Sequence, residues 1–582
     1  MTYLDRINAP QDLKKFSIHE MNGLADEIRQ AILNRDSMIG GHVGPNLGIV
    51  EATIALHYVF DSPKDKIVYD VSHQSYPHKL LTGRKNGFLT KEGMSVISGY
   101  TNPAESEHDF FKVGHTSTSV SLACGLAKAR DLKSEKHNVI ALIGDGSLSG
   151  GEALEGFSNA AVLNSNIIIV VNDNEMSIAE NHGGLYNNLR LLRETKGTAE
   201  CNMFKALGFD YLYVEDGNSL ESLIAAFKQV KDTPRPTVVH IRTLKGKGYK
   251  PAEENKERWH WNVPFEIESG KAKIDMSGEN YNDITYDYLI DKIAKDKTVV
   301  AVNAGTPGAV GLTPERRAKL GQNFVDVGIA EEHAVAFSSA LAKGGCKPVY
   351  MVLSSFIQRA YDQLSQDLAI NNNPAVILVS WAGISSADVT HLGCFDIAMI
   401  SNIPNIVYLA PTSKEEYLSM LDWAVDQNEH PVVIRIPSVV THSASAVEKN
   451  YGALNRYQIA QKGSQVALIA AGSFFGLGQQ VADRLKEKGI NATLINPRYL
   501  SGIDENVLDE LQSNHSLVAT LEDGIVNGGF GEKIASFYGT SAMKVLNFGA
   551  KKEFTDRTPL DEIYQRNHLT VEQIVADITK NI

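Results

Sequence analysis

The chain has 582 residues, more than one hydrophobic core usually serves, so we expect about three domains. Its formal net charge of −13 argues against a nucleic-acid partner, because DNA and RNA are themselves polyanions. A hydrophobic content of 43% can fill several cores and excludes wholesale disorder.

The cysteines and the opening residues narrow the class of protein further. The opening stretch "MTYLDRINAPQDLKKF" has no apolar signal core, and no apolar run approaches the ~20 residues of a membrane helix. We therefore expect a cytoplasmic protein with no membrane partner. Neither a zinc knuckle nor a disulfide framework is predicted, because the cysteines lie far apart with no CxxC pair. They are Cys124, Cys201, Cys346 and Cys394.

Short β-branched runs alternate with longer segments of helical period along the chain. This alternation predicts an α/β fold with repeated βα units around mainly parallel sheets. Charged, weakly patterned sequence interrupts it near 266–285 and near 441–456. We expect three domains, spanning 1–270, 284–445 and 455–582. The β-branched runs are 138–144, 166–173, 236–243, 298–305, 347–354, 375–380, 405–411, 464–472 and 489–500.

In the first domain, the run 138–144 ends on an acid between two glycines, "GDG". Gly144 and Gly146 permit a tight turn and close approach of a ligand. The segment 147–163 has helical period, so the amino end of a helix would point at this turn. That arrangement suits a diphosphate, but Asp145 would repel one unless a divalent cation lay between them.

The run 166–173 leads into a second polar motif, "NDN", at positions 172–174. Oxygens of Asp145, Asn174 and a main-chain carbonyl near Met176 would suit magnesium, with phosphate oxygens and water completing the octahedron. The alternative is a strand-end turn with a capping aspartate and an Asx turn. The metal site is favoured because an acid and amides each end a β-branched run.

GDG followed by NDN at this spacing resembles the thiamine diphosphate motif. Further stretches, "GGHVGPNLGIVEATIALHYVFDSPKDKIVYDVSHQSYPHKLLTGR", "GHTSTS", "GIAEEHAV" and "SSFIQRAYDQ", resemble the transketolase-like 1-deoxy-D-xylulose-5-phosphate synthase family through nearly the whole chain. The resemblance implies a transketolase-like fold, thiamine diphosphate bound between the first two domains, a homodimer and a role in isoprene biosynthesis. It also implies the reaction. Pyruvate, a keto-acid donor, is decarboxylated, and its two-carbon fragment is joined to an aldehyde acceptor, glyceraldehyde 3-phosphate.

The resemblance assigns the metal ligands and the cofactor's acid. Asp145, Asn174 and Met176 match the magnesium-binding positions. Glu331 matches the glutamate at the aminopyrimidine, where a carboxyl is needed to protonate the ring and promote its imino tautomer. Without the resemblance, Glu331 would be interpreted as an acid stabilised in the first turn of a helix.

Other matching positions surround the cofactor. Phe356 would pack on the pyrimidine, although by itself it is typical of a core residue. Lys245 matches a basic residue near the site, and its alternative is a solvated lysine in a turn. The cofactor-binding set carried over is His73, Gly114, His115, Ser117, Gly144, Asp145, Gly146, Asn174, Lys245, Glu331 and Phe356.

Five histidines lie in the matching segments. Because imidazole titrates near neutrality, a cluster of histidines can shuttle protons as a carbonyl becomes an alkoxide. A single loop histidine is otherwise typical of a structural donor. Asp388, three residues before His391, would orient the surroundings of the donor carboxylate or the acceptor hydroxyls. The histidines are His42, His73, His115, His260 and His391, and all but His115 are expected to be catalytic, with Glu331 and Asp388.

The chain departs from the family pattern in two places. It largely lacks a long insertion that the family carries after "NDNEMSIAEN", which puts any gating role of that segment in doubt. The family holds the acceptor's phosphate with a tyrosine and two arginines, and those positions are Leu353, Trp381 and Ser438 here. Arg359 and Arg435 remain nearby but match separate arginines of the family.

Three hypotheses about function therefore stay open. The first is a carboligase of the deoxyxylulose-phosphate synthase type. The second is a paralogue that uses an unphosphorylated or different aldehyde, or a ketose donor. The third is a catalytically silent scaffold or regulatory subunit, which the intact Asp145, Asn174 and Glu331 argue against.

Overall fold

The computed structural model describes residues 2–275, 277–443 and 446–582. The chain forms two compact units, Met1–Ser277 with Gly328–Ala330, and Gly278–Val327 with Glu331–Ile582. The boundary at 277/278 falls inside the first predicted interruption. The division into three domains stays a prediction. Among the described residues, no helix combines the length and the apolar character needed to cross a bilayer.

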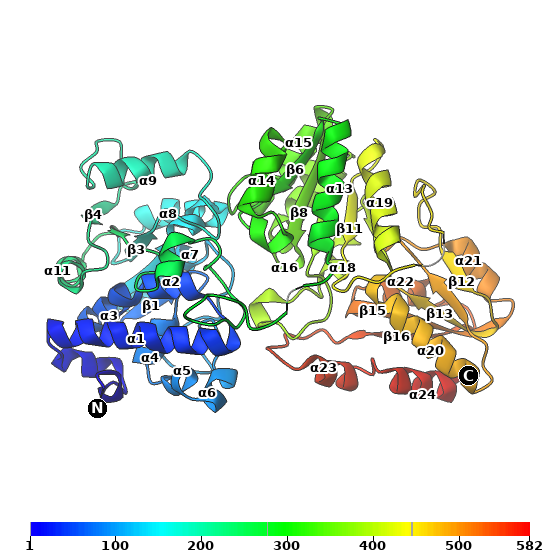
Figure 1. The fold of residues 1–582 in the computed structure, drawn as a ribbon, viewed down its shortest axis with the longest axis horizontal. Coiled ribbons are helices and arrows are strands. Elements are labelled where there is room, and N and C mark those ends of the chain that lie inside the picture. The colour runs from blue at the N-terminus through cyan, green and yellow to red at the C-terminus, as the bar shows by residue number, and fades with distance from the viewer. Residues whose placement is uncertain (1, 276, 444–445) are drawn as a thin grey trace. The chain divides into compact units, whose positions relative to one another are not determined.

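The first unit contains a five-stranded sheet in the order β1-β2-β3-β5-β4, and every pair is parallel (Figure 1). Its strands are β1 Lys66–Tyr69, β2 Val139–Gly144, β3 Ile168–Asp173, β4 Asp210–Val214 and β5 Thr237–Arg242. Its helices are α1 Ile18–Ile39, α2 Val43–Gly48, α3 Val50–Val59, α4 Tyr76–Leu81, α5 Asn86–Leu89, α6 Lys91–Val96, α7 Ser119–Leu132, α8 Gly151–Ala161, α9 Leu185–Glu194, α10 Met203–Leu207, α11 Leu220–Val230 and α12 Lys250–Glu254.

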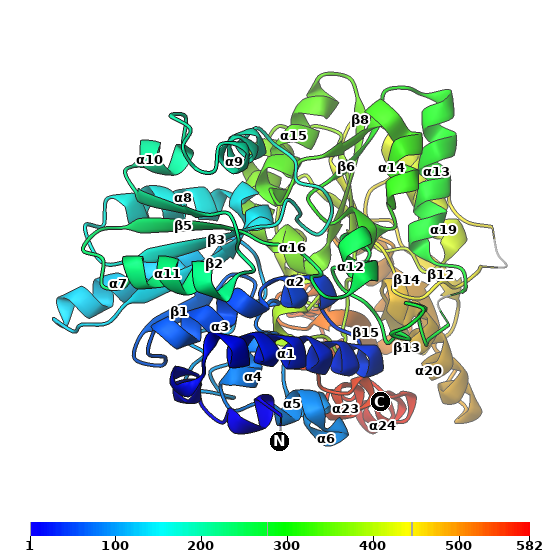
Figure 2. The same cartoon turned by 60° about the vertical axis from the view of Figure 1, so that its left-hand side comes forward.

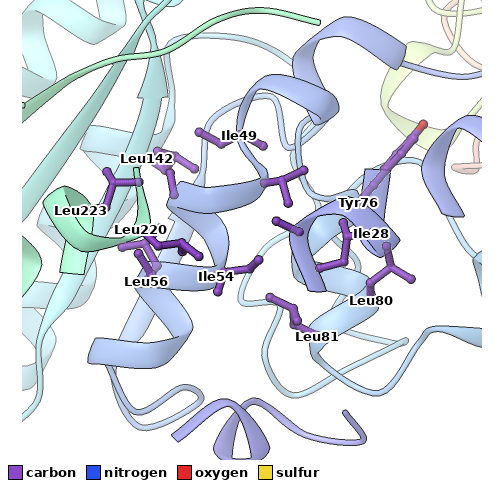
Figure 3. Close-up of a cluster of buried hydrophobic side chains, with 14 of the residues drawn as sticks. Ile28, Ile49, Ile54, Leu56, Tyr76, Leu80, Leu81, Leu142, Leu220 and Leu223 are labelled. Carbon is purple, nitrogen blue, oxygen red and sulfur yellow. The ribbon is translucent and has the colours of Figure 1, made fainter. Parts of the chain in front are cut away.

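Both faces of this sheet are buried, which is why β2 and β3 have continuous apolar sequences. Alternate residues point to opposite faces. Leu142 packs on one face with α1, α3, α4 and α11, as Figure 3 shows for Ile28, Leu56 and Leu223. Helices α7 and α8 lie along the strands of this sheet (Figure 2), and Ile143 packs with residues of both helices on the other face. The two cores fix the sheet and therefore the loops at its edges.

The second unit contains two sheets. One has the order β10-β11-β9-β8-β6-β7 and is entirely parallel. The other has the order β12-β14-β13-β15-β16, in which only the β12–β14 pair is antiparallel. The prediction of an α/β fold with mainly parallel sheets is therefore confirmed.

The elements of the second unit alternate in the same way. Its strands are β6 Val299–Asn303, β7 Phe324–Asp326, β8 Lys347–Leu353, β9 Val376–Ser380, β10 Val407–Leu409, β11 Val432–Arg435, β12 Gln458–Gln461, β13 Gln465–Ala470, β14 Thr493–Asn496, β15 His515–Ile525 and β16 Lys544–Ala550. Its helices are α13 Tyr281–Lys295, α14 Pro314–Leu320, α15 Glu331–Lys343, α16 Ser354–Ile357, α17 Tyr361–Gln363, α18 Asp396–Ile400, α19 Lys414–Asp426, α20 Phe475–Glu487, α21 Glu505–Leu511, α22 Phe530–Phe537, α23 Leu560–Arg566 and α24 Val571–Asn581.

Candidate functional site

The carboxyl ends of three adjacent strands gather the predicted metal and cofactor residues of the first unit. β2, β3 and β5 are neighbours in the sheet and pair in parallel. Asp145 directly follows β2, Asn174 directly follows β3, and Lys245 lies just beyond β5. The topology therefore brings these residues to one edge, the edge at which parallel α/β sheets usually bind ligands.

Asp145 is a buried carboxyl group at this edge. It is 1% exposed, and its Oδ2 accepts a hydrogen bond from Asn181 Nδ2 at 2.8 Å. Burial raises the pKa of Asp145 to about 8, and the charge of Asp173 adds to the shift. A divalent cation would supply the positive charge that favours the ionised carboxylate here.

The loop that follows β3 offers further oxygen atoms. Among the residues that the structure describes, Asn174 Oδ1, Ser177 Oγ and Asn181 Oδ1 are buried and have no hydrogen-bond partner. Buried polar atoms are seldom left unpaired, so this loop suits a bound cation. Met176, the third predicted ligand, lies in the same loop.

The donor set fits magnesium. Within residues 2–275, 277–443 and 446–582, no three His, Cys, Asp or Glu side chains cluster as metal ligands. A site here would combine the single carboxylate of Asp145 with amide and carbonyl oxygens, which magnesium accepts and which softer metals do not select.

Asp173, the central residue of NDN, anchors the loop. Its Oδ2 lies 2.9 Å from His240 Nε2 and 2.6 Å from Arg193 Nη1, and its Oδ1 accepts a hydrogen bond from the Glu175 backbone N–H. Burial alone would raise the pKa of Asp173, but the hydrogen bond from His240 and the charge of Arg193 lower it. Asp173 therefore holds the start of the candidate metal loop, residues 174–181, and is committed to protein partners.

A second loop, leading into α7, carries the predicted Gly114, His115 and Ser117. Ser117 adopts a positive φ of 77°. The backbone N–H groups of Ser117 and Ser119 donate to the two carboxylate oxygens of Asp70, at 2.8 and 3.0 Å. Asp70 thus fixes the conformation of this loop from the end of β1.

Three predicted histidines form one cluster. The ring centroids of His42 and His73 lie 5.1 Å apart, those of His73 and His260 5.2 Å, and those of His42 and His260 5.6 Å. Burial and the charge of Lys245 hold the pKa of His260 well below its usual value. His260 is therefore neutral at pH 7 and able to accept a proton or to donate one.

Lys245 belongs to the same cluster. Its Nζ donates to the Ser177 carbonyl at 2.6 Å and lies 3.2 Å from His260 Nδ1. It is only 2% exposed, so the alternative of a solvated lysine in a turn is wrong. Burial lowers the pKa of Lys245 to about 7.

Glu331 is the first residue of α15 in the second unit. It is buried, and its Oε2 lies 3.4 Å from Arg359 Nη1. Burial raises the pKa of Glu331, and the charge of Arg359 offsets part of that shift. An acid that only complements a helix dipole has no need to be buried, so the burial of Glu331 favours a role for its carboxyl group in the candidate site.

Phe356 and His391 are neighbours in the second unit, with ring centroids 5.7 Å apart in an edge-to-face arrangement. Burial lowers the pKa of His391 to about 4. Its Nδ1 lies 2.9 Å from Thr390 Oγ1, which in turn donates to Asp388 Oδ1 at 2.8 Å. Asp388 therefore reaches His391 through Thr390 and positions it.

Comparison with known proteins identifies the chain's relatives. A family model described as 1-deoxy-D-xylulose-5-phosphate synthase matches residues 4–202 and 190–243. Models of the transketolase pyrimidine binding domain and C-terminal domain match 280–440 and 455–574. The 1-deoxy-D-xylulose-5-phosphate synthase of Brevibacillus brevis is 37% identical over 99% of this chain and 98% of its own length. The chain belongs to the 1-deoxy-D-xylulose-5-phosphate synthase family.

Other members of the family are similar to the same extent. The synthase of Caldanaerobacter subterraneus is 38% identical, and that of Lachnoclostridium phytofermentans 37%, each over 99% of this chain and 98% of the relative. The chain is therefore an enzyme of a transketolase-like family that transfers two-carbon units with thiamine diphosphate.

The structure adds site residues to those recognised in the synthase sequence motifs. Within the described part of the chain, Asn181 and Ser177 bring buried oxygens without a hydrogen-bond partner to the candidate metal loop, and Asp70 fixes the loop before α7. Asp70 could have been found from the sequence, because it ends the apolar run "KIVYD" in the same way as Asp145 and Asp173 end their runs. Ser177 and Asn181 lie in an irregular loop that has no periodic pattern.

The two glycines of GDG differ in what surrounds them, and the stability of the protein should therefore respond differently to a methyl group at each position. A Cβ on Gly146 would lie 2.7 Å from Ser177 Oγ and 2.8 Å from Ser177 Cα, whereas one on Gly144 would meet nothing within 4 Å. We expect Gly146→Ala to destabilise the cofactor-free protein by ~1–3 kcal/mol, because the metal loop must shift. Gly144→Ala is the matched control and should leave the melting temperature unchanged. Equal melting temperatures for the two variants would contradict this account.

Proposed function

We propose that the chain is a thiamine diphosphate- and magnesium-dependent carboligase. It decarboxylates pyruvate and joins the two-carbon fragment to an aldehyde, the type of reaction for which its relatives are named. The observation that carries the proposal is the loop at Asp145, where a buried carboxyl group lies with buried, unpaired oxygens that a diphosphate-bound cation would satisfy. The alternative of a silent scaffold gives no reason for this donor set or for the buried Glu331.

The proposed roles of the residues follow from their chemistry. Asp145, Asn174 and the Met176 carbonyl would hold magnesium, and the loop at Gly114–Ser117 would line the diphosphate. When bound, the cofactor supplies the electron sink that stabilises the carbanion left by decarboxylation. Glu331 would share a proton with the pyrimidine ring through its buried carboxyl group, and Phe356 would pack against that ring.

Proton transfer to the substrates would fall to the histidines. Neutral imidazoles can donate from one ring nitrogen and accept at the other, so the cluster of His42, His73 and His260 suits an oxygen that changes from carbonyl to alkoxide. Lys245 donates to the Ser177 carbonyl and so supports the loop that carries the proposed metal ligands. His391 would act from the second unit.

The test is the release of CO2 from carboxyl-labelled pyruvate, with thiamine diphosphate and magnesium, with and without short aldehydes. We expect release that requires both cofactors, accompanied by a ketose that carries the two-carbon fragment. Absence of CO2 release and of ligated product with every aldehyde tried would refute the proposed function.

We also propose that the enzyme is a cytoplasmic homodimer, with family membership as the support. Such oligomers are usually symmetric and bury a large interface. Light scattering should give twice the chain mass of 63.6 kDa. A monomer at micromolar concentration would contradict the proposal.

A further inference from the structure

The carboxyl edge of the sheet in the second unit gathers residues that can select the acceptor. β8, β9 and β11 are adjacent parallel strands, with Leu353 at the end of β8 paired to Ser380 at the end of β9. Leu353 ends β8, Trp381 directly follows β9, and Ser438 lies just beyond β11. These are also the positions at which the sequence departs from the phosphate-holding pattern of the family.

The two arginines near this edge, Arg359 and Arg435, already form ion pairs with carboxylates. Arg435 is buried, with Nε 2.7 Å from Asp396 Oδ2 and Nη1 paired with Asp523 Oδ1. The guanidinium and its two carboxylate partners together carry a net negative charge. Arg359 pairs with Glu331 at 3.4 Å. A phosphate dianion would have to displace a buried carboxylate to reach either arginine.

Ser438 also lies beside acidic groups. It lines a cavity of about 410 Å³ together with Glu279 and His442. His442 lies 2.8 Å from Glu279 and 2.9 Å from Glu415, so its positive charge when protonated is shared by two carboxylates. Lys414, the nearby lysine, is also paired with Glu279. The surroundings of Ser438 are therefore no better suited to a phosphate than those of Arg359 and Arg435.

Trp381 presents an apolar surface on a strained backbone. Its φ is +54°, which is unusual for a bulky residue, and the residue is 62% exposed. The Trp381 carbonyl oxygen packs so closely against Gly393 that a Cβ added to Gly393 would lie 2.0 Å from it. The Gly383 N–H group donates to the Gly393 carbonyl at 2.9 Å. The contacts with Gly393 therefore hold the backbone of Trp381 in a left-handed conformation that tryptophan rarely adopts.

We propose that the aldehyde accepted at this edge carries no phosphate group, and that Trp381 is a specificity-determining residue that contacts it. This inference rests on the proposed carboligase function. An exposed indole offers a flat apolar face for the carbon chain of an uncharged aldehyde. A phosphate would gain little positive charge here, because Arg359 and Arg435 are paired with carboxylates and the basic residues near Ser438 are paired with Glu279 and Glu415.

The first experiment compares acceptors with the wild-type enzyme loaded with thiamine diphosphate and magnesium, at saturating pyruvate. We expect kcat/KM for D-glyceraldehyde to lie within about tenfold of that for glyceraldehyde 3-phosphate or to exceed it, since one charge-assisted phosphate contact alone gives about tenfold or more. A larger preference for the phosphorylated aldehyde overturns the inference and leaves the carboligase function standing. Absence of CO2 release and of product with both aldehydes refutes the proposed function, and the inference with it.

The second experiment tests Trp381 directly. Trp381→Arg should move the ratio of kcat/KM values toward glyceraldehyde 3-phosphate by about tenfold or more. Ile370→Arg is the matched control, because Ile370 is exposed in the turn that enters β9, at the opposite edge of the same sheet. An equal shift in both variants would show that added charge acts without any contact at Trp381.

Trp381→Gly covers the case in which arginine does not tolerate the positive φ, since glycine adopts it freely. We expect a higher KM for D-glyceraldehyde, with a smaller change in kcat. An unchanged KM would overturn the role of Trp381.

Discussion

Asp145→Ala should abolish magnesium-dependent binding of thiamine diphosphate. The substitution removes the one carboxylate of the proposed donor set, so the charge of the diphosphate would lose its cation. Loss of groups that merely orient metal ligands weakens metal binding by about 10- to 100-fold, so loss of a ligand should cost on the order of 100-fold or more in the cofactor's Kd. Isothermal titration calorimetry at fixed magnesium measures this directly.

The protein should stay folded when Asp145 is replaced by a neutral residue, so a loss of cofactor binding can be assigned to the lost ligand. In the cofactor-free protein, burial disfavours the ionised form of Asp145, so the neutral Asp145→Asn variant should melt no lower than wild type. Glu155→Ala, at an exposed position on α8, is the surface control and should bind the cofactor normally. If Asp145→Ala bound thiamine diphosphate as tightly as wild type at the same magnesium concentration, the metal site would lie elsewhere.

Glu331→Gln should separate cofactor binding from turnover. Glutamine keeps the shape of the side chain but has no carboxyl proton to give, so kcat should fall by on the order of 10² to 10⁴-fold, the usual range for a general acid. The Kd of thiamine diphosphate should change little, because the metal and diphosphate residues are untouched. Steady-state kinetics and calorimetry on the same preparation measure the two effects.

Glu332→Gln is the matched control for this prediction. Glu332 is the next residue of α15 and is only partly buried, so the same chemical change there should leave kcat near the wild-type value. Near-normal turnover by Glu331→Gln together with a loss in Glu332→Gln would transfer the acid's role to Glu332. Near-normal turnover by both variants would require a different source of the proton.

The positions of the proposed metal and cofactor residues could be predicted from the sequence where these residues lie at the ends of regular elements. Asp145 and Asn174 each follow an apolar run, and parallel strands place such positions on one edge, so their proximity follows from the pattern. The convergence of the histidines was suggested by the resemblance alone. His42, His73 and His260 come from separate loops, and only the folded chain brings their rings together.

Burial and pairing over long sequence distances could not be predicted in this way. Lys245 lies in the glycine-containing stretch "KGKGY", which is typical of an exposed turn, yet the residue is buried, and a Cβ on Gly44 would lie only 3.4 Å from its Cγ. The partners of Arg435 are 39 and 88 residues away in the chain, so no local pattern announces them. Tertiary packing decides both environments.

The pairing of Arg435 with Asp523 has an evolutionary consequence. Asp523 belongs to β15 in the sheet that follows the pyrimidine-domain match, yet it helps set the charge at the edge that carries Trp381. Selection for a different acceptor therefore need not add a basic residue, because loss of this one carboxylate would leave the guanidinium balanced by Asp396 alone and would remove the net negative charge of the group. Ancestry and substrate preference could then change separately, because Asp523 lies outside the stretches around Asp145, Asn174 and Glu331 that carry the family resemblance.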